Sequence, residues 1–297
     1  MMHLASTEAP KRSRTSSTSR RGLPDKDRQV PEHPILCILS NPRSGSTALR
    51  RALAAGGRIK DFGEIFHDER ELTISPFLNF LERWPDPLLS VFKWSECVRM
   101  SRAYVEQLVF ESYGQKALID VKHNAWGVLK SLWQYPHDEP VFMAVLKARC
   151  ALFLQLKRES LADQVISYII ANNTNVWHRQ ITNSDIPKSL IGKRLDPVLV
   201  RRVCTLFCRA EALTDELLAD YPHRLTLSYE TTFIDGALAA HVADRLSIAS
   251  GVKIRPVAPS QRPNIVDKRE VVSNYDEVLE IAAAVRAAQP TDQVDRK

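Results

Sequence analysis

Three short stretches in a row decide how the chain folds: ILCILS (residues 35–40), NPRSGST (41–47) and ALRRAL (48–53). The first is apolar and rich in aliphatic and β-branched residues, which predicts a buried strand. The second breaks this pattern with a proline and a glycine and brings in hydroxyl side chains. In the third, Leu49, Leu53 and Ala54 recur at helical spacing and Gly56-Gly57 ends the helix. The sequence therefore predicts a strand, a tight polar loop and a helix.

This strand–loop–helix unit is suited to bind an anion. Free backbone N–H groups at the start of a helix converge on one point, and the loop places Arg43 beside them. The guanidinium group of arginine is a planar, permanently charged fork that fits phosphate or sulfate oxygens. The loop lacks the GxxxxGK[ST] spacing of a nucleotide-kinase phosphate loop. An ordinary turn with a capping serine explains the same residues, so the two readings stay open at this point.

Composition indicates a soluble globular protein with no charged nucleic-acid face. The chain has 297 residues, of which 44% are hydrophobic and 26% are charged, and its net charge is +6. Residues 1–30 hold seven basic and three acidic side chains, a net +4 that leaves only +2 for the rest. The body is nearly balanced, so we expect no nucleic-acid partner.

The first 33 residues are crowded with Ser, Thr, Arg and Pro and lack apolar periodicity, which predicts a disordered basic tail. Neither a signal peptide nor an apolar run of about eighteen residues is present, so we expect a cytoplasmic protein without a transmembrane segment. The five cysteines fit no metal spacing and are expected to be reduced core thiols. We expect one domain over residues 34–288 and a flexible C-terminus over 289–297.

Further along the chain, four segments carry side chains of chemical interest. The segment DFGEIFH (61–67), interpreted as a loop, holds Glu64 and His67, both suited to proton transfer. The strand ALIDVK (117–122) ends in Lys122, and Lys93 in VFKWSE is a weaker basic candidate. RLTLSYE (224–230) is interpreted as a strand with its exit residues.

A second anion-binding unit is predicted around Arg158. This residue follows a strand (151–156) and precedes a helix whose apolar residues recur four apart from residue 161 to residue 169. Ser167 lies about 160° around the helix from that apolar stripe and should face away from it. An exposed arginine and an ordinary helix serine explain the same pattern.

Strands and helices alternate along the chain, which predicts an α/β fold with a mostly parallel sheet and helices on both faces. Residues 72–110 are expected to be helical segments interrupted at Pro85 and Pro87. Further helices are expected over 201–220, 237–250 and 275–288.

Taken together, these segments resemble sulfotransferases that use 3′-phosphoadenylyl sulfate (PAPS), particularly the bacterial carbohydrate type. NPRSGSTALRRAL resembles the 5′-phosphosulfate loop of that family, and LKRESLADQVISYIIANNTNVWH resembles its 3′-phosphate motif. GEIFH, DVKHN, LSYE and the C-terminal SQRP…VVSNYDEV resemble four further segments, in the same order, across roughly residues 35–280. The resemblance implies a three-layer, P-loop-like nucleotide-binding fold.

The resemblance also implies roles for individual residues. Glu64 would be the general base on the acceptor hydroxyl, with Lys122 and Arg43 stabilising charge on the reacting oxygens. His67 stays open as the base, and Lys93 as the lysine. The residues that would hold PAPS are Arg43, Ser44, Gly45, Ser46, Thr47, Ala48, Arg158, Ser167 and Arg262.

The resemblance implies a carbohydrate or glycolipid acceptor, PAPS as sulfuryl donor and no metal, and it leaves the formation of a homodimer open. Two alternatives remain: an atypical nucleotide or sugar kinase, and a non-catalytic nucleotide- or glycan-binding protein of the same fold. The absence of a GK[ST] lysine, and of a metal-binding carboxylate after a strand, counts against the kinase. A large distance between Glu64 and the Arg43 loop would favour the non-catalytic protein.

Overall fold

The computed structural model describes residues 34–67, 76–127, 139–174, 177, 191–256 and 268–289. The expected tail (1–33), Arg262 and the C-terminal residues after 289 lie outside the described residues. The predictions made for these segments therefore stay predictions.

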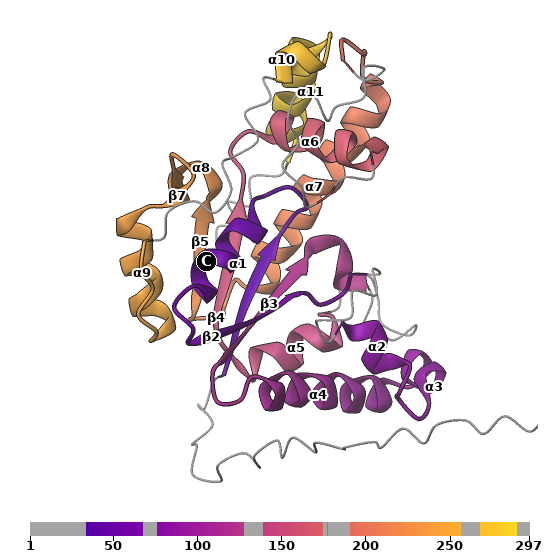
Figure 1. Cartoon of the computed structure of the whole chain (residues 1–297). Helices are drawn as coiled ribbons and strands as arrows, with labels where there is room; N and C mark the ends of the chain where they lie inside the picture. Colours follow the sequence, from indigo (N-terminus) through magenta and orange to yellow (C-terminus); the bar gives the residue numbers. More distant parts are fainter. Residues whose placement is uncertain are drawn as a thin grey trace, which may run out of the picture.

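A parallel sheet lies at the centre of the molecule (Figure 1), in the strand order β2-β3-β1-β4-β5. Each pair of neighbouring strands runs in the same direction, so all carboxyl ends lie at one edge. β1 is in the middle because its six residues, buried on both faces, leave it no solvent-facing side. The strands are β1 (Ile35–Ser40), β2 (Ile59–Glu64), β3 (Lys116–Lys122), β4 (Cys150–Lys157) and β5 (Arg224–Ser228).

Helices cover both faces of the sheet, and the two faces have separate cores. Residues 35, 37 and 39 of β1 pack with Tyr104 of α4 (Trp94–Glu111) and Phe142 of α5 (Val141–Lys147). Residues 36 and 38 point to the other face, which α1 (Ser46–Ala54) and α9 (Ala240–Ser250) cover. This alternation follows from the two-residue period of a strand. The structure confirms the predicted α/β fold with helices on both faces of a parallel sheet.

A third group of helices packs around its own core next to the end of β4 (Figure 1). It consists of α6 (Leu161–Thr174), α7 (Pro197–Leu217), α10 (Lys268–Val271) and α11 (Tyr275–Ala287). The core of the group includes Val165, Ile169, Phe207 and Ile281. α7 is long enough to reach from this core to the one under the sheet, where Leu213 and Leu217 pack. The third helical group therefore lies next to the carboxyl ends of the strands.

The short elements confirm the predicted breaks. α2 (Phe77–Leu81) ends before Pro85, and α3 (Pro87–Phe92) begins at Pro87. The side chain of Asp86 accepts a hydrogen bond from the N–H of Leu89 (3.4 Å). Proline is favoured at the first helical position because its missing N–H would be unpaired there anyway. The remaining elements are the 3₁₀ helix η1 (His123–Gly127), α8 (Tyr229–Thr232), β6 (Phe233–Ile234) and β7 (Ala237–Leu238).

Two predictions about local structure were wrong. The segment 61–67 is not wholly a loop, because β2 continues to Glu64 by pairing with β3 after a register shift. The helix expected from residue 237 begins at residue 240, after the β6–β7 pair. In both cases strand pairing, not local propensity, decides the boundary. Residues 229 and 230 follow β5 as its exit residues, as expected, and begin α8.

All five cysteines are buried and none of them forms a disulfide, which agrees with their prediction as core thiols. In the described part of the chain, no helix is both long and apolar enough to cross a membrane. No group of His, Cys, Asp and Glu side chains suited to a metal ion occurs among these residues either.

Candidate active site

Residues from the carboxyl ends of all five strands meet in one region. β1 leads into the Asn41–Gly45 loop, β2 ends at Glu64 and β3 ends at Lys122. Arg158 follows β4, and Tyr229 follows β5. In parallel sheets, ligands bind outside the carboxyl ends of the strands, so this edge is the expected position of a site.

Hydrogen bonds to the third helical group hold the Asn41–Gly45 loop in place. Gln164 of α6 donates hydrogen bonds to the carbonyl of Pro42 (3.0 Å) and to Oγ of Ser44 (2.9 Å). The amide of Asn41 donates to Glu211 Oε1 (2.9 Å) and to a backbone carbonyl of α7. Ser44 Oγ donates to the carbonyl of Asn41 (2.6 Å), so this hydroxyl group stabilises the loop itself. These hydrogen bonds hold the loop in this shape.

The backbone at the start of α1 offers unpaired N–H groups. The carbonyl of Gly45 accepts from the N–H groups of Ala48 (3.0 Å) and Leu49 (3.2 Å), which closes the first helical turn. Within the described residues, the N–H groups of Gly45, Ser46 and Thr47 have no hydrogen-bond acceptor. These groups and the positive end of the helix dipole make a place for an anion.

Tyr229 connects this loop to Arg158. The Tyr229 ring lies against the backbone of Gly45, so closely that a Cβ atom there would be 2.4 Å from Cδ2 of the ring. The guanidinium carbon of Arg158 lies 5.0 Å from the centre of the same ring, and Arg158 Nη1 donates to the carbonyl of Arg43 (3.2 Å). The structure therefore brings the two predicted anion-binding motifs together.

Arg43 occupies a strained and partly buried position in the loop. Its φ of 64° is in the left-handed region, and its guanidinium group donates to the carbonyl of Trp177. Arg43 Nε is buried and finds no hydrogen-bond partner among the described residues. Burial and the nearby Arg158 lower the pKa of Arg43, and Glu64 opposes this shift. The loop therefore has unsatisfied positive charge that a bound anion would neutralise.

Lys122 lies at the centre of a charged cluster on the other side of the loop. Its Nζ is 3.2 Å from Glu64 Oε1 and 2.8 Å from Asp120 Oδ2, and it also donates to the hydroxyl groups of Ser40 (3.3 Å) and Ser46. Strand register explains the cluster, because Ser40 is aligned with Lys122 and Glu64 with Asp120. Glu64 is therefore close to the loop and not distant from it.

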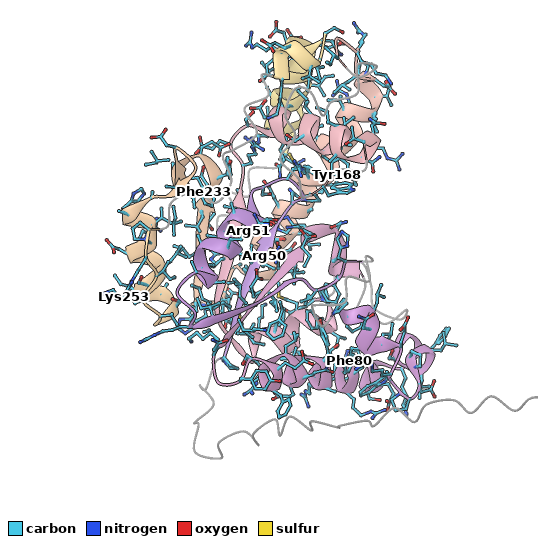
Figure 2. The ribbon with its side chains drawn as sticks, viewed as in Figure 1. Arg50, Arg51, Phe80, Tyr168, Phe233 and Lys253 are labelled. Carbon is cyan, nitrogen blue, oxygen red and sulfur yellow. The ribbon has the colours of Figure 1, made fainter. Side chains whose placement is uncertain are left out.

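Asp120 and Arg50 support this cluster, and the sequence analysis missed both. The side chain of Asp120 is fully buried, and Arg50 of α1 lies 3.6 Å from it and 3.0 Å from Asp61. Figure 2 shows Arg50 over the middle of the sheet. A charged residue inside the apolar strand 117–122 was the one signal that could have identified Asp120. Its partners come from different strands and helices, so they could not be identified from spacing.

His123, directly after Lys122, is also a buried polar residue that the sequence analysis did not select. Neither of its ring nitrogens has a hydrogen-bond partner among the described residues. Burial, and then the charges of Lys122 and Lys157, lower the pKa of His123 to about 3. Its imidazole is therefore neutral at physiological pH.

The other predicted residues are placed less centrally. Ser167 is half-buried on α6, and the stripe of residues 161, 165 and 169 beneath it is buried, as predicted. His67 follows β2, three residues beyond Glu64, and Lys93 is exposed at the α3–α4 junction. Thr47 and Ala48 lie half-buried in the first turn of α1. Of the two candidate lysines, only Lys122 contacts the Asn41–Gly45 loop or α1 in the described structure.

The chain was compared with known proteins and protein families. No curated protein is significantly similar to it. The sequence model of the Stf0 sulphotransferase family matches residues 36–194, more than half of the chain. The match covers the loop after β1, Glu64, Lys122, Arg158 and Ser167. From this match and the strand–loop–helix unit at the edge of a parallel sheet, we conclude that the chain belongs to the Stf0 sulphotransferase family.

Proposed function

We propose that this sulfotransferase moves a sulfuryl group from PAPS to a hydroxyl group of a carbohydrate or glycolipid. The observation that carries the proposal is the meeting of Glu64, Lys122 and Arg158 around the Asn41–Gly45 loop, in a chain of the Stf0 family. The 5′-phosphosulfate and 3′-phosphate of the donor both need positive charge, and Arg43 and Arg158 supply it from two connected motifs.

In this proposal the donor is held at both ends. The N–H groups of Gly45, Ser46 and Thr47, together with Arg43, bind the 5′-phosphosulfate. Arg158 and Ser167 bind the 3′-phosphate, as the resemblance implies. Arg262 is proposed for the same site and lies outside the described residues.

Transfer then breaks the bond between sulfur and the bridging oxygen of the donor and forms a bond between sulfur and the acceptor oxygen. Glu64 takes the proton of the acceptor hydroxyl, and adenosine 3′,5′-bisphosphate leaves with the electron pair of the broken bond. Lys122 lies 3.2 Å from Glu64 and contacts the first residue of α1. It is thus positioned to stabilise the negative charge that develops on the transferring and leaving oxygens.

A direct assay tests the proposed function. Purified protein is incubated with PAPS carrying ³⁵S and a panel of glycans and glycolipids, and label transfer is measured. We expect labelled product with at least one hydroxyl-bearing acceptor. Parallel reactions with ATP labelled at the γ-phosphate test the kinase alternative, and label transfer from ATP alone would contradict the proposal.

We predict that Arg158→Ala weakens the binding of adenosine 3′,5′-bisphosphate without unfolding the protein. Loss of a charge-assisted contact costs roughly 1.5–3 kcal/mol, or about 10- to 150-fold in affinity. Calorimetric titration measures the effect, and Arg99→Ala, an exposed arginine paired with Glu96 on α4, is the control. Unchanged affinity in Arg158→Ala would remove this residue from the donor site.

A further inference from the structure

Lys268 of α10 is a buried cation whose role the sequence analysis did not assign. Its side chain is only 15% exposed, and its Nζ lies 3.3 Å from Asp163 Oδ1. Asp163, in the first turn of α6, also accepts a hydrogen bond from the hydroxyl of Tyr275 (3.1 Å). Lys268 is therefore held against α6 by its ion pair with Asp163.

The face of α6 that Lys268 contacts is the face that carries Ser167. Asp163 and Ser167 are four residues apart, and residues at this spacing are neighbours on the surface of a helix. Arg158 precedes the same helix. Lys268 therefore contacts α6 one helical turn from Ser167, and the charge of Arg158 acts on its ammonium group.

Three cations in this region, Arg43, Arg158 and Lys268, repel one another. Each has an opposite charge near it, which for Arg43 is Glu64. Asp163 pairs with Lys268, and Glu230 lies 3.7 Å from Arg158. Burial, followed by the charge of Arg158, lowers the pKa of Lys268 to about 8, although Asp163 opposes this shift. A further anion would relieve the repulsion between the cations.

We propose that Lys268 is a specificity-determining residue that selects donors carrying a 3′-phosphate. On binding, its ammonium group exchanges Asp163 for the phosphate, and Asp163 is the counter-ion that holds it in place beforehand. This inference rests on the proposed function, because it assumes that Arg158 and Ser167 face the 3′-phosphate. A 5′-phosphate-only nucleotide would gain nothing from Lys268.

The proposal predicts opposite effects for the two members of the pair. Removing the cation weakens phosphate binding, since the phosphate loses a contact. Removing the carboxylate strengthens it, because Asp163 would otherwise compete for Lys268 and repel the phosphate. A salt bridge that only stabilises the fold would give effects of the same sign in both variants, or none.

The experiment measures affinities for adenosine 3′,5′-bisphosphate and adenosine 5′-monophosphate by calorimetry, in the full chain. For Lys268→Met we expect the affinity for the bisphosphate to fall by about tenfold or more and that for the monophosphate to change less than about twofold. Lys268→Arg should keep most of the preference. The matched control is Lys253→Met, an exposed lysine after α9 (Figure 2).

Asp163→Asn is the second variant, and it keeps the test decisive if Lys268→Met does not fold. We expect it to raise the affinity for the bisphosphate by about threefold. The inference is overturned if Lys268→Met keeps the wild-type preference for the bisphosphate over the monophosphate. It is also overturned if Asp163→Asn binds the bisphosphate no more tightly than the wild type does. Either result would leave the proposed function in place. If the unmodified chain does not prefer the bisphosphate over the monophosphate, the proposed donor and this inference both fail.

Discussion

Glu64→Gln is expected to lower turnover by about 10²- to 10⁴-fold, the usual contribution of a general base. Glutamine keeps the shape of the side chain but cannot take the proton of the acceptor hydroxyl. Lys122 would lose one ion pair and keep the other, with Asp120 at 2.8 Å, so its position should be preserved. We therefore expect the affinity for adenosine 3′,5′-bisphosphate to stay near that of the wild type.

The assay compares turnover at saturating PAPS with a calorimetric measurement of nucleotide affinity. His67→Ala is the matched variant, because His67 follows Glu64 by three residues and is the other candidate base. We expect it to keep most of its turnover. If Glu64→Gln stays active and His67→Ala does not, the roles are exchanged; if neither variant matters, the base is elsewhere.

Gly45→Ala is expected to damage both folding and donor binding. The φ of Gly45 is 90°, and a left-handed conformation costs an L-residue roughly 1–2 kcal/mol. The added Cβ would lie 2.4 and 2.5 Å from two atoms of the Tyr229 ring, and overpacking of this kind costs about 1–3 kcal/mol more. Displacement of Tyr229 would also disturb Arg158, which lies over that ring.

We therefore expect the Gly45→Ala variant to lose about 2–5 kcal/mol of unfolding free energy. Its nucleotide affinity should fall by up to about 150-fold, the upper value for loss of the Arg158 contact. Chemical denaturation and calorimetry measure these effects. Gly57→Ala is the control: its φ is 69°, but nothing lies within 4 Å of the added Cβ. It should lose only about 1–2 kcal/mol and bind normally. Normal binding by Gly45→Ala would show that the ring of Tyr229 moves without affecting Arg158.

Local patterns predicted the central elements well. The apolar run of residues 35–40 and the glycine and hydroxyl residues after it indicated a buried strand, a loop and a helix, and the structure has all three. Arg158 was expected between a strand and a helix, where it is. These predictions succeeded because burial on both faces and helical periodicity leave a strong local pattern.

Prediction was weaker where distant segments decide the structure. β2 reaches Glu64 only because it pairs with β3. From the local sequence alone, residues 61–67 were predicted to be a loop. α5 (Val141–Lys147) was not predicted, since a single short apolar stretch does not distinguish a strand from a buried helix. Asp120, Arg50 and Lys268 were not selected, because each one acquires its partner from another part of the chain.

The sequence by itself determined the alternation of strands and helices, the loop after β1 with Arg43 and Gly45, and membership of the Stf0 sulphotransferase family. Only the tertiary structure decided which charges meet. Parallel pairing aligns Ser40 with Lys122 and Glu64 with Asp120, and the packing of α10 against α6 brings Lys268 to Asp163. The physical reason is that secondary structure follows from interactions between near neighbours in the chain, whereas a charged site is assembled from residues that only sheet register and helix packing bring within a few ångströms.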